Sequence, residues 1–233
     1  KQKFWIKNDI KTMFCTSAGA FVGVIISLDF EWQILDNYLI NRPWEKLVSF
    51  EPENLFSAYK RKGLLNINFI TEAVKPLLQA KDIPLTVTLQ EFYEIVNIEL
   101  HMYTIDLNED IFKTIDISYK THPNMKLLDA LTATTAVPVL LPPLCIEEHC
   151  YIDGGLLDNL PLKYCIEQTN SNVENILVVK NNYTSKSIPK IYEDSTAIQY
   201  LISLINKITL HINSESKQPI IPNTVSCLLG KYS

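Results

Sequence analysis

Residues 11–26 constrain the fold of this chain more than any other stretch. They read as a short apolar strand, a sharp turn that carries Ser17, and a helix that opens with Ala18, Gly19 and Ala20. A strand that turns directly into a helix needs small residues after the turn, because the helix backbone passes close to it. The stretch therefore predicts a nucleophile elbow, which holds a serine hydroxyl exposed above the end of a strand.

The first amide groups of such a helix have no acceptor inside the helix and point at the group that the turn presents. An oxyanion would fit that place. The same residues also fit a buried strand and a core helix in which Ser17 is only a turn residue or a helix cap. The usual G-x-S-x-G pattern is matched imperfectly, because Cys15 stands two positions before the serine.

Length and composition indicate one globular domain of the α/β class. The 233 residues are too few for two ordinary domains to be the first expectation, and 47% of them are hydrophobic. We therefore predict a single domain over 1–233. The net charge of -5 and the scattered lysines predict no nucleic-acid partner.

The cysteines and the apolar runs bear on the cellular setting. Five cysteines without a framework spacing are typical of reduced thiols, so we expect an intracellular, cytoplasmic protein that needs no disulfides. No signal peptide is visible, and the longest nearly unbroken apolar run, 18–28, is too short to span a bilayer. Any membrane contact is therefore expected to be peripheral.

Helix and strand patterns alternate along the rest of the chain, as they do in α/β proteins. Residues 88–91 form a capping box that starts a helix at Leu89, and three prolines make 136–143 a rigid apolar loop. The strand at 176–179 is expected to be buried on both faces, and the helix at 198–212 to pack on the sheet, with a lipid-facing lid as the alternative. The other expected elements are helices within 30–47, 55–63, 68–76 and 126–134, and strands at 98–102, 112–118, 144–146 and 150–152.

A serine nucleophile needs a base, and Asp153 is the candidate that the pattern favours. It follows an apolar strand and precedes Gly154 and Gly155, which permit a tight turn and leave room beside the carboxylate. The alternative for these three residues is an ordinary turn. Asp158 and Asn159 are expected to be turn or cap residues.

Three motifs in a fixed order carry a family resemblance. They are Cys15-Thr16-Ser17-Ala18-Gly19-Ala20, the proline-containing segment 134–143, and the segment 152–162 that begins Ile-Asp-Gly-Gly. In this order they resemble the G-T-S-A-G-A elbow, the A-x-P-x-x-x-P-P segment and the D-G-G-x-x-x-N-x-P element of the patatin-like phospholipases. The resemblance extends over about 11–179, and the remainder of the chain is generic.

The resemblance implies a three-layer α/β/α sandwich with a central mostly parallel sheet. It also implies a Ser-Asp dyad without histidine, in which Ser17 is the nucleophile, Asp153 its base, and an acyl-enzyme the intermediate. A free aspartate has a pKa of about 3.9 and is a weak base for a hydroxyl. Burial beside the apolar wall 138–144 would raise the pKa of Asp153 and strengthen its hydrogen bond to the serine.

The resemblance further implies how the rest of the site is built. The amide of Ala18 and a glycine-rich loop upstream of the elbow would hold the oxyanion, while Gly19, Gly154 and Gly155 would support the elbow and the turn. Residues 1–233 are therefore expected to be a patatin-like domain without its upstream first strand and glycine loop. Neither a cofactor nor a metal is implied.

The predicted function is that of a lipid acyl hydrolase. Its substrate would be a phospholipid or another acyl lipid at a membrane surface, where the protein would bind peripherally, with or without a protein activator. The alternative is a catalytically silent patatin-like domain that binds lipid or a protein partner. That alternative is motivated by Cys15 at the first glycine position and by the missing glycine loop.

Two other site chemistries compete with the dyad. An α/β-hydrolase triad would need a histidine after Asp153, and His211 is the only one in that part of the sequence that could serve. A zinc site could draw on Cys145, His149, Cys150 and Cys165, but no C-x-x-C pair exists among them. Both chemistries are expected to be absent.

Overall fold

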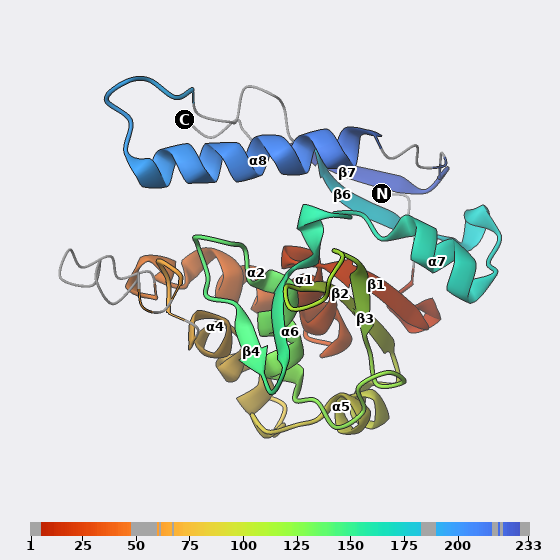
Figure 1. Ribbon diagram of the computed structural model, residues 1–233. Helices are drawn as coiled ribbons and strands as arrows, with labels where there is room; N and C mark the ends of the chain where they lie inside the picture. Colours follow the sequence, from red (N-terminus) through yellow and green to blue (C-terminus); the bar gives the residue numbers. More distant parts are fainter. Residues whose placement is uncertain are drawn as a thin grey trace. The chain divides into compact units, whose positions relative to one another are not determined.

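The computed structural model describes residues 6–47, 60, 62–66, 68–182, 190–215, 219 and 221–228 (Figure 1). The chain divides into two compact units, one of Lys11–Gly155 and one of Lys1–Ile10 with Leu156–Ser233. The expectation of a single domain over 1–233 stays a prediction. The predicted helix over 55–63 lies largely outside the described residues.

The unit Lys11–Gly155 alternates strands with helices, and it contains both predicted catalytic residues. Its strands are β1 (Thr12–Thr16), β2 (Glu99–Asp106), β3 (Thr114–Ile117), β4 (Leu144–Ile146) and β5 (His149–Asp153). Its α-helices are α1 (Ala18–Ser27), α2 (Trp32–Asn41), α4 (Asn68–Gln79), α5 (Leu89–Val96) and α6 (Leu127–Thr135). The α/β class and the strand–turn–helix near the N-terminus are confirmed.

Strand β2 organises the sheet of this unit, because three strands pair with it. β1 pairs parallel with 99–103, and β5 pairs antiparallel with 104–106. β3 pairs with 102–105, so Tyr103 lies between β1 and β3, and Thr104 lies between β5 and β3. Since a strand has only two edges, β1 and β5 share the edge that β3 leaves open. Their carboxyl ends therefore meet, opposite Tyr103 and Thr104.

The direction of pairing differs along the sheet. The parallel pairs among the described strands are β1 with β2 and, in the other unit, β6 (Val178–Asn182) with β7 (Thr224–Leu228). β3 and β5 each pair antiparallel with β2, and β4 pairs antiparallel with β5 in the hairpin 144–153, which needs no crossover connection. The predicted parallel pairing thus applies to the strand before Ser17, and an antiparallel hairpin delivers Asp153.

Helix α4 continues past Pro76, where the sequence predicts an interruption. Proline has no N–H group, so the carbonyl of Glu72 loses its helical donor. Nη2 of Arg42 donates to that oxygen at 2.6 Å, and the hydroxyl of Tyr38 donates to the next carbonyl, that of Ala73, at 2.6 Å. These side-chain donors replace the missing backbone bond, so the helix can run to Gln79.

Helix packing closes the core around the sheet. α1 packs on β1, and α6 packs on β2 and β5. Tyr103, Met102 and Leu131 are fully buried in this core. The predicted capping box of α5 is present: Thr88 Oγ1 accepts the N–H of Glu91, and a carboxylate oxygen of Glu91 accepts the N–H of Thr88 at 2.8 Å. The site therefore rests on a well-packed scaffold.

The second unit contains α7 (Leu162–Thr169), β6, α8 (Ala197–Glu215) and β7. Its buried apolar cluster consists of Leu162, Ile176, Val178 and Ile221. Val179 is 62% exposed, so the expectation that 176–179 is buried on both faces is wrong. β6 pairs with β7 in a sheet of two described strands, and neighbouring side chains of a strand point to opposite faces, so Val178 joins the cluster while Val179 points away from it. The predicted helix at 198–212 is present as α8.

Cys145 and Cys150 form a disulfide across the β4–β5 hairpin. The expectation of reduced thiols without a disulfide is therefore wrong for this pair. The hairpin register places the two residues directly opposite each other, with their Cα atoms 4.0 Å apart, and sequence spacing alone does not show that register. Cys15, Cys165 and Cys227 are free thiols.

Candidate active site

Ser17 occupies the turn between β1 and α1, as the elbow motif predicts. Its backbone has φ 54° and ψ -129°, a left-handed conformation that non-glycine residues rarely adopt. Such a conformation persists only where the surroundings hold it, and it presents the side chain at the end of the strand. The elbow is thus a strained turn rather than a regular helix cap, since no side-chain cap bond is formed by Ser17.

Ser17 and Asp153 are in direct contact. The serine Oγ donates to Oδ2 of Asp153 at 2.5 Å, across 136 positions of sequence. The contact follows from the sheet, because β1 and β5 end against each other on one edge of β2. No third side chain stands between the hydroxyl and the carboxylate.

The carboxylate of Asp153 is 3% exposed, and this burial governs its electrostatics. Loss of hydration raises the pKa of Asp153 to about 6, although the hydrogen bonds from Ser17 and from the Gly155 amide both lower it. The Gly155 N–H donates to Oδ1 at 2.7 Å, so each carboxylate oxygen accepts one bond. Asp153 is therefore a stronger base than a free aspartate, and it remains ionised at neutral pH.

The predicted glycines have different surroundings. A Cβ atom on Gly154 would lie 2.5 Å from the carbonyl oxygen of Tyr103, so only glycine fits where the chain leaves β5 beside β2. A Cβ atom on Gly19 would meet nothing within 4 Å. Close approach thus explains Gly154, whereas Gly19 stands in open space at the start of α1.

Cys15 does not face the reactive serine. It is buried, and its Sγ would lie 2.9 Å from a Cβ atom built on Gly23 of α1. Burial also raises the pKa of the Cys15 thiol to about 12, so the group stays protonated and unreactive. The side chain of Cys15 therefore packs between β1 and α1. It does not narrow the space around Ser17 Oγ.

The segment that links α6 to the proline loop contacts both members of the pair. Thr134 Oγ1 accepts the N–H of Ser17 at 3.0 Å, and Ala136 O accepts the N–H of Asp153 at 3.1 Å. The sequence pattern assigned no role to Thr134. A buried threonine one position before the end of a helix is too common to single out, and only the fold brings it to the elbow.

Comparison with known proteins places this arrangement in a family. The model of the patatin-like phospholipase family matches residues 7–166. The chain belongs to that family. Its α/β fold and the strand–turn–helix near its N-terminus are therefore shared with the other members of that family.

Two viral proteins are similar to this patatin-like chain. Probable lipid hydrolase 463L of Invertebrate iridescent virus 6 is 25% identical over 169 residues, which cover 70% of this chain and 56% of that protein. Uncharacterized protein R571 of Acanthamoeba polyphaga mimivirus is 18% identical over 155 residues, or 66% of this chain and 50% of the relative. The chain spans about half the length of these relatives.

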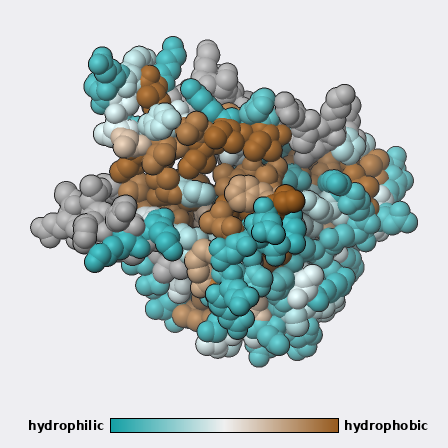
Figure 2. Space-filling model, in the orientation of Figure 1, coloured by the Kyte–Doolittle hydropathy of each residue, from teal (hydrophilic) through white to brown (hydrophobic). Residues whose placement is uncertain are grey.

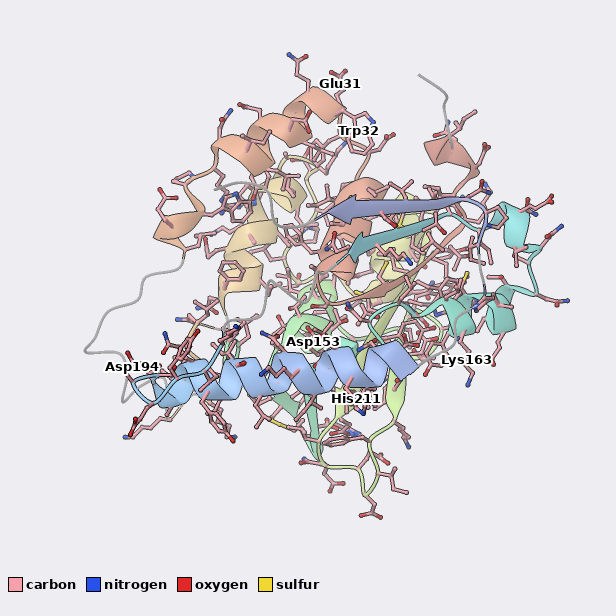
Figure 3. The ribbon with its side chains drawn as sticks, turned by 90° about the horizontal axis from the view of Figure 1, so that it is seen from above. Glu31, Trp32, Asp153, Lys163, Asp194 and His211 are labelled. Atoms are coloured by element: carbon pink, nitrogen blue, oxygen red, sulfur yellow. A yellow bond between two sulfur atoms is a disulfide. The ribbon has the colours of Figure 1, made fainter. Side chains whose placement is uncertain are left out.

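The structure describes the residues that the two competing chemistries would use. His211 lies on α8, in the other unit (Figure 3), and the Ser17 hydroxyl is bonded directly to a carboxylate. Cys145 and Cys150 are joined to each other, so neither can supply a thiolate ligand. Within the described part of the chain, no three His, Cys, Asp or Glu residues are grouped so that they could hold a metal ion.

Proposed function

We propose that this protein is a lipid acyl hydrolase that uses Ser17 as nucleophile and Asp153 as general base, through an acyl-enzyme. The 2.5 Å hydrogen bond from Ser17 Oγ to a nearly fully buried carboxylate carries the proposal. A base must lie within hydrogen-bond reach of the proton that it abstracts, and its pKa should be close to the working pH. The raised pKa of Asp153, about 6, meets the second condition.

The proposed reaction has two halves. Ser17 Oγ attacks the ester carbonyl carbon while its proton passes to Asp153 Oδ2, and the tetrahedral intermediate collapses with transfer of that proton to the leaving alcohol. Water then attacks the acyl-serine, gives a proton to Asp153, and releases the fatty acid as the serine recovers its proton. The amides of Ala18 and Gly19 precede the hydrogen bond from Ala20 N–H to Ser17 O at 2.9 Å, and they would face the oxyanion.

The proposed substrate is a phospholipid or another acyl lipid, met at a membrane surface. The helices of the described ranges include none with the length and hydrophobicity needed to cross a bilayer. Leu201, Leu204 and Ile208 of α8 are each about 40–50% exposed, and Figure 2 shows apolar side chains along this helix. Exposed apolar surface of this kind supports contact with a lipid aggregate.

The test measures fatty-acid release from mixed phospholipid vesicles by the full-length protein. Ser17→Ala and Asp153→Asn should both fall to background, because each removes one atom of the proton-transfer pair. Ser27→Ala is the matched control, since Ser27 is a buried serine of α1 whose hydroxyl donates to the Gly23 carbonyl in the same helix, and it should retain activity.

Two other outcomes would change the proposal. If the wild-type protein releases no acid and Ser17 does not react with a fluorophosphonate probe, while vesicles still bind, the domain is a lipid-binding module. If Asp153→Asn keeps wild-type activity and His211→Ala abolishes it, the base is a histidine.

A further inference from the structure

We infer that Thr134 is a positioning residue that holds Ser17 in its reactive conformation. The inference rests on the proposed function, because it concerns the same nucleophile. Thr134 lies near the end of α6 and its side chain is completely buried. It does not touch the reacting oxygen itself, so its effect must pass through the backbone of the elbow.

One hydroxyl group joins three elements of the fold. Thr134 Oγ1 of α6 accepts the N–H of Ser17 at 3.0 Å and donates its own proton to the carbonyl of Tyr103 in β2 at 2.5 Å. A hydroxyl can accept and donate at once, and among side chains of this size only serine and threonine do both. Valine has the shape of threonine but can form neither bond.

The N–H of Ser17 is the group that needs this support. The residue has a positive φ of 54°, which costs free energy and persists only where neighbouring groups fix it. Rotation of φ toward its ordinary negative range reorients the peptide group that carries this N–H and moves the side chain away from the strand end. The bond to Thr134 opposes that rotation, because the threonine is itself anchored to β2.

The same helix end also fixes the partner of Ser17. Ala136, two residues after Thr134, accepts the N–H of Asp153 at 3.1 Å. The backbones of nucleophile and base are thus both bonded to 134–136. This segment sets the distance between the two strand ends, on which the contact between Ser17 Oγ and Asp153 Oδ2 depends.

The test compares Thr134→Val with Thr134→Ser in the full-length protein. Thr132→Val is the matched control, because Thr132 is a buried threonine of the same helix whose hydroxyl donates to Leu128 O at 2.7 Å, within α6 itself. For each variant we would measure the rate of Ser17 labelling by a fluorophosphonate, kcat and KM for vesicle lipid per folded molecule, and hydrogen exchange at the Ser17 amide.

Loss of the hydrogen bond between Thr134 Oγ1 and the Ser17 N–H should slow the chemical step. Misplacement of a reacting group by about 1 Å costs about 100-fold in rate, so Thr134→Val should lose about that factor in labelling rate and in kcat, with KM unchanged. Thr134→Ser should restore both, and Thr132→Val should resemble wild type. The Ser17 amide should exchange faster only in Thr134→Val.

Three results would overturn the inference. They are an unchanged labelling rate per folded molecule in Thr134→Val, an equal loss in Thr132→Val, and an unchanged exchange rate at the Ser17 amide. Failure of the proposed function has a different signature. In that case wild-type protein releases no fatty acid, while the amide of Ser17 still depends on Thr134.

Discussion

Cys15 and Gly23 are a fitted pair. The Cys15 sulfur of β1 lies beside Gly23 of α1, and a Cβ atom on Gly23 would be only 2.9 Å from it. Both residues are buried, and the Cys15 side chain lies against the backbone of Gly23. Cys15 stands at the first glycine position of the family's elbow motif. Gly23 of α1 leaves the space that its sulfur occupies.

Gly23→Ala should destabilise the protein by about 1–3 kcal/mol, because the added methyl group overpacks the contact with Cys15. Cys15→Ala should be mild alone, and the double variant should recover most of the stability that Gly23→Ala loses. Chemical denaturation of the four proteins measures the coupling between the two positions. Additive effects would show that the two side chains do not compete for the same space.

Gly154→Ala and Gly19→Ala should have opposite outcomes. At Gly154 the new methyl group would lie 2.5 Å from the Tyr103 carbonyl oxygen, so β5 must shift and carry Asp153 with it. We expect Gly154→Ala to lower the free energy of unfolding by several kcal/mol or more and to leave little activity. Gly19→Ala meets open space and gains helix propensity, so its melting temperature should be unchanged or slightly raised. Equal destabilisation by both substitutions would contradict this account.

Activity should depend on the ionisation of Asp153. Only the carboxylate accepts the serine proton, so kcat/KM should rise as pH increases through about 6 and then level off. The profile is measured on a soluble ester, so that the lipid surface does not titrate as well. A profile whose inflection lies near pH 4 would show that the carboxylate is hydrated during the reaction.

The same burial means that ionised Asp153 lowers the free energy of unfolding at neutral pH. A folded pKa near 6, above the ordinary 3.8, means that stability is greatest when the group is protonated and falls as pH rises from about 4 to about 6. The loss is roughly 3 kcal/mol above that window. Asp153→Asn should therefore be inactive but more stable than wild type at pH 8, with the difference shrinking toward pH 4, as thermal unfolding would record.

His101 should give a pH dependence of the same sign, but in a higher pH range. Burial lowers its pKa, but hydrogen bonds and charges from Asp116 and Glu99 outweigh burial and raise it above 6.5. Its ring nitrogen Nδ1 lies 2.7 Å from the Asp116 carboxylate, and Nε2 lies 2.6 Å from the Glu99 carboxylate. The stabilisation is complete below about 6.5 and is lost as pH rises through the folded pKa. Thermal unfolding between pH 6 and 9 should show this loss in wild type and in His211→Gln, and a flatter profile in His101→Gln.

The two residues of the proposed dyad could be predicted from the sequence because their signals are local. Small residues after Ser17 and glycines after Asp153 are requirements of the turns themselves, and an apolar run before each marks a strand. The capping box of α5 could be predicted for the same reason, since all its hydrogen bonds lie within 88–91. Local backbone geometry limits which residues are allowed at a turn, so the residue types themselves indicate the turn.

Features that depend on register or on distant partners needed the tertiary structure. The disulfide follows from the pairing of Cys145 with Cys150, and the continuation of α4 past Pro76 depends on Arg42, some thirty residues earlier. The exposure of Val179 depends on which face of β6 the rest of its unit covers.

By itself, then, the sequence determined which residues form the turns that present Ser17 and Asp153. Only the tertiary structure decided that β1 and β5 share one edge of β2, so that the two turns meet and the hydroxyl reaches the carboxylate. It also decided that Thr134 supports the elbow and that Cys15 faces α1. The physical reason is that turns are set by the conformations of a few adjacent residues, whereas strand pairing and burial are set by the whole chain at once.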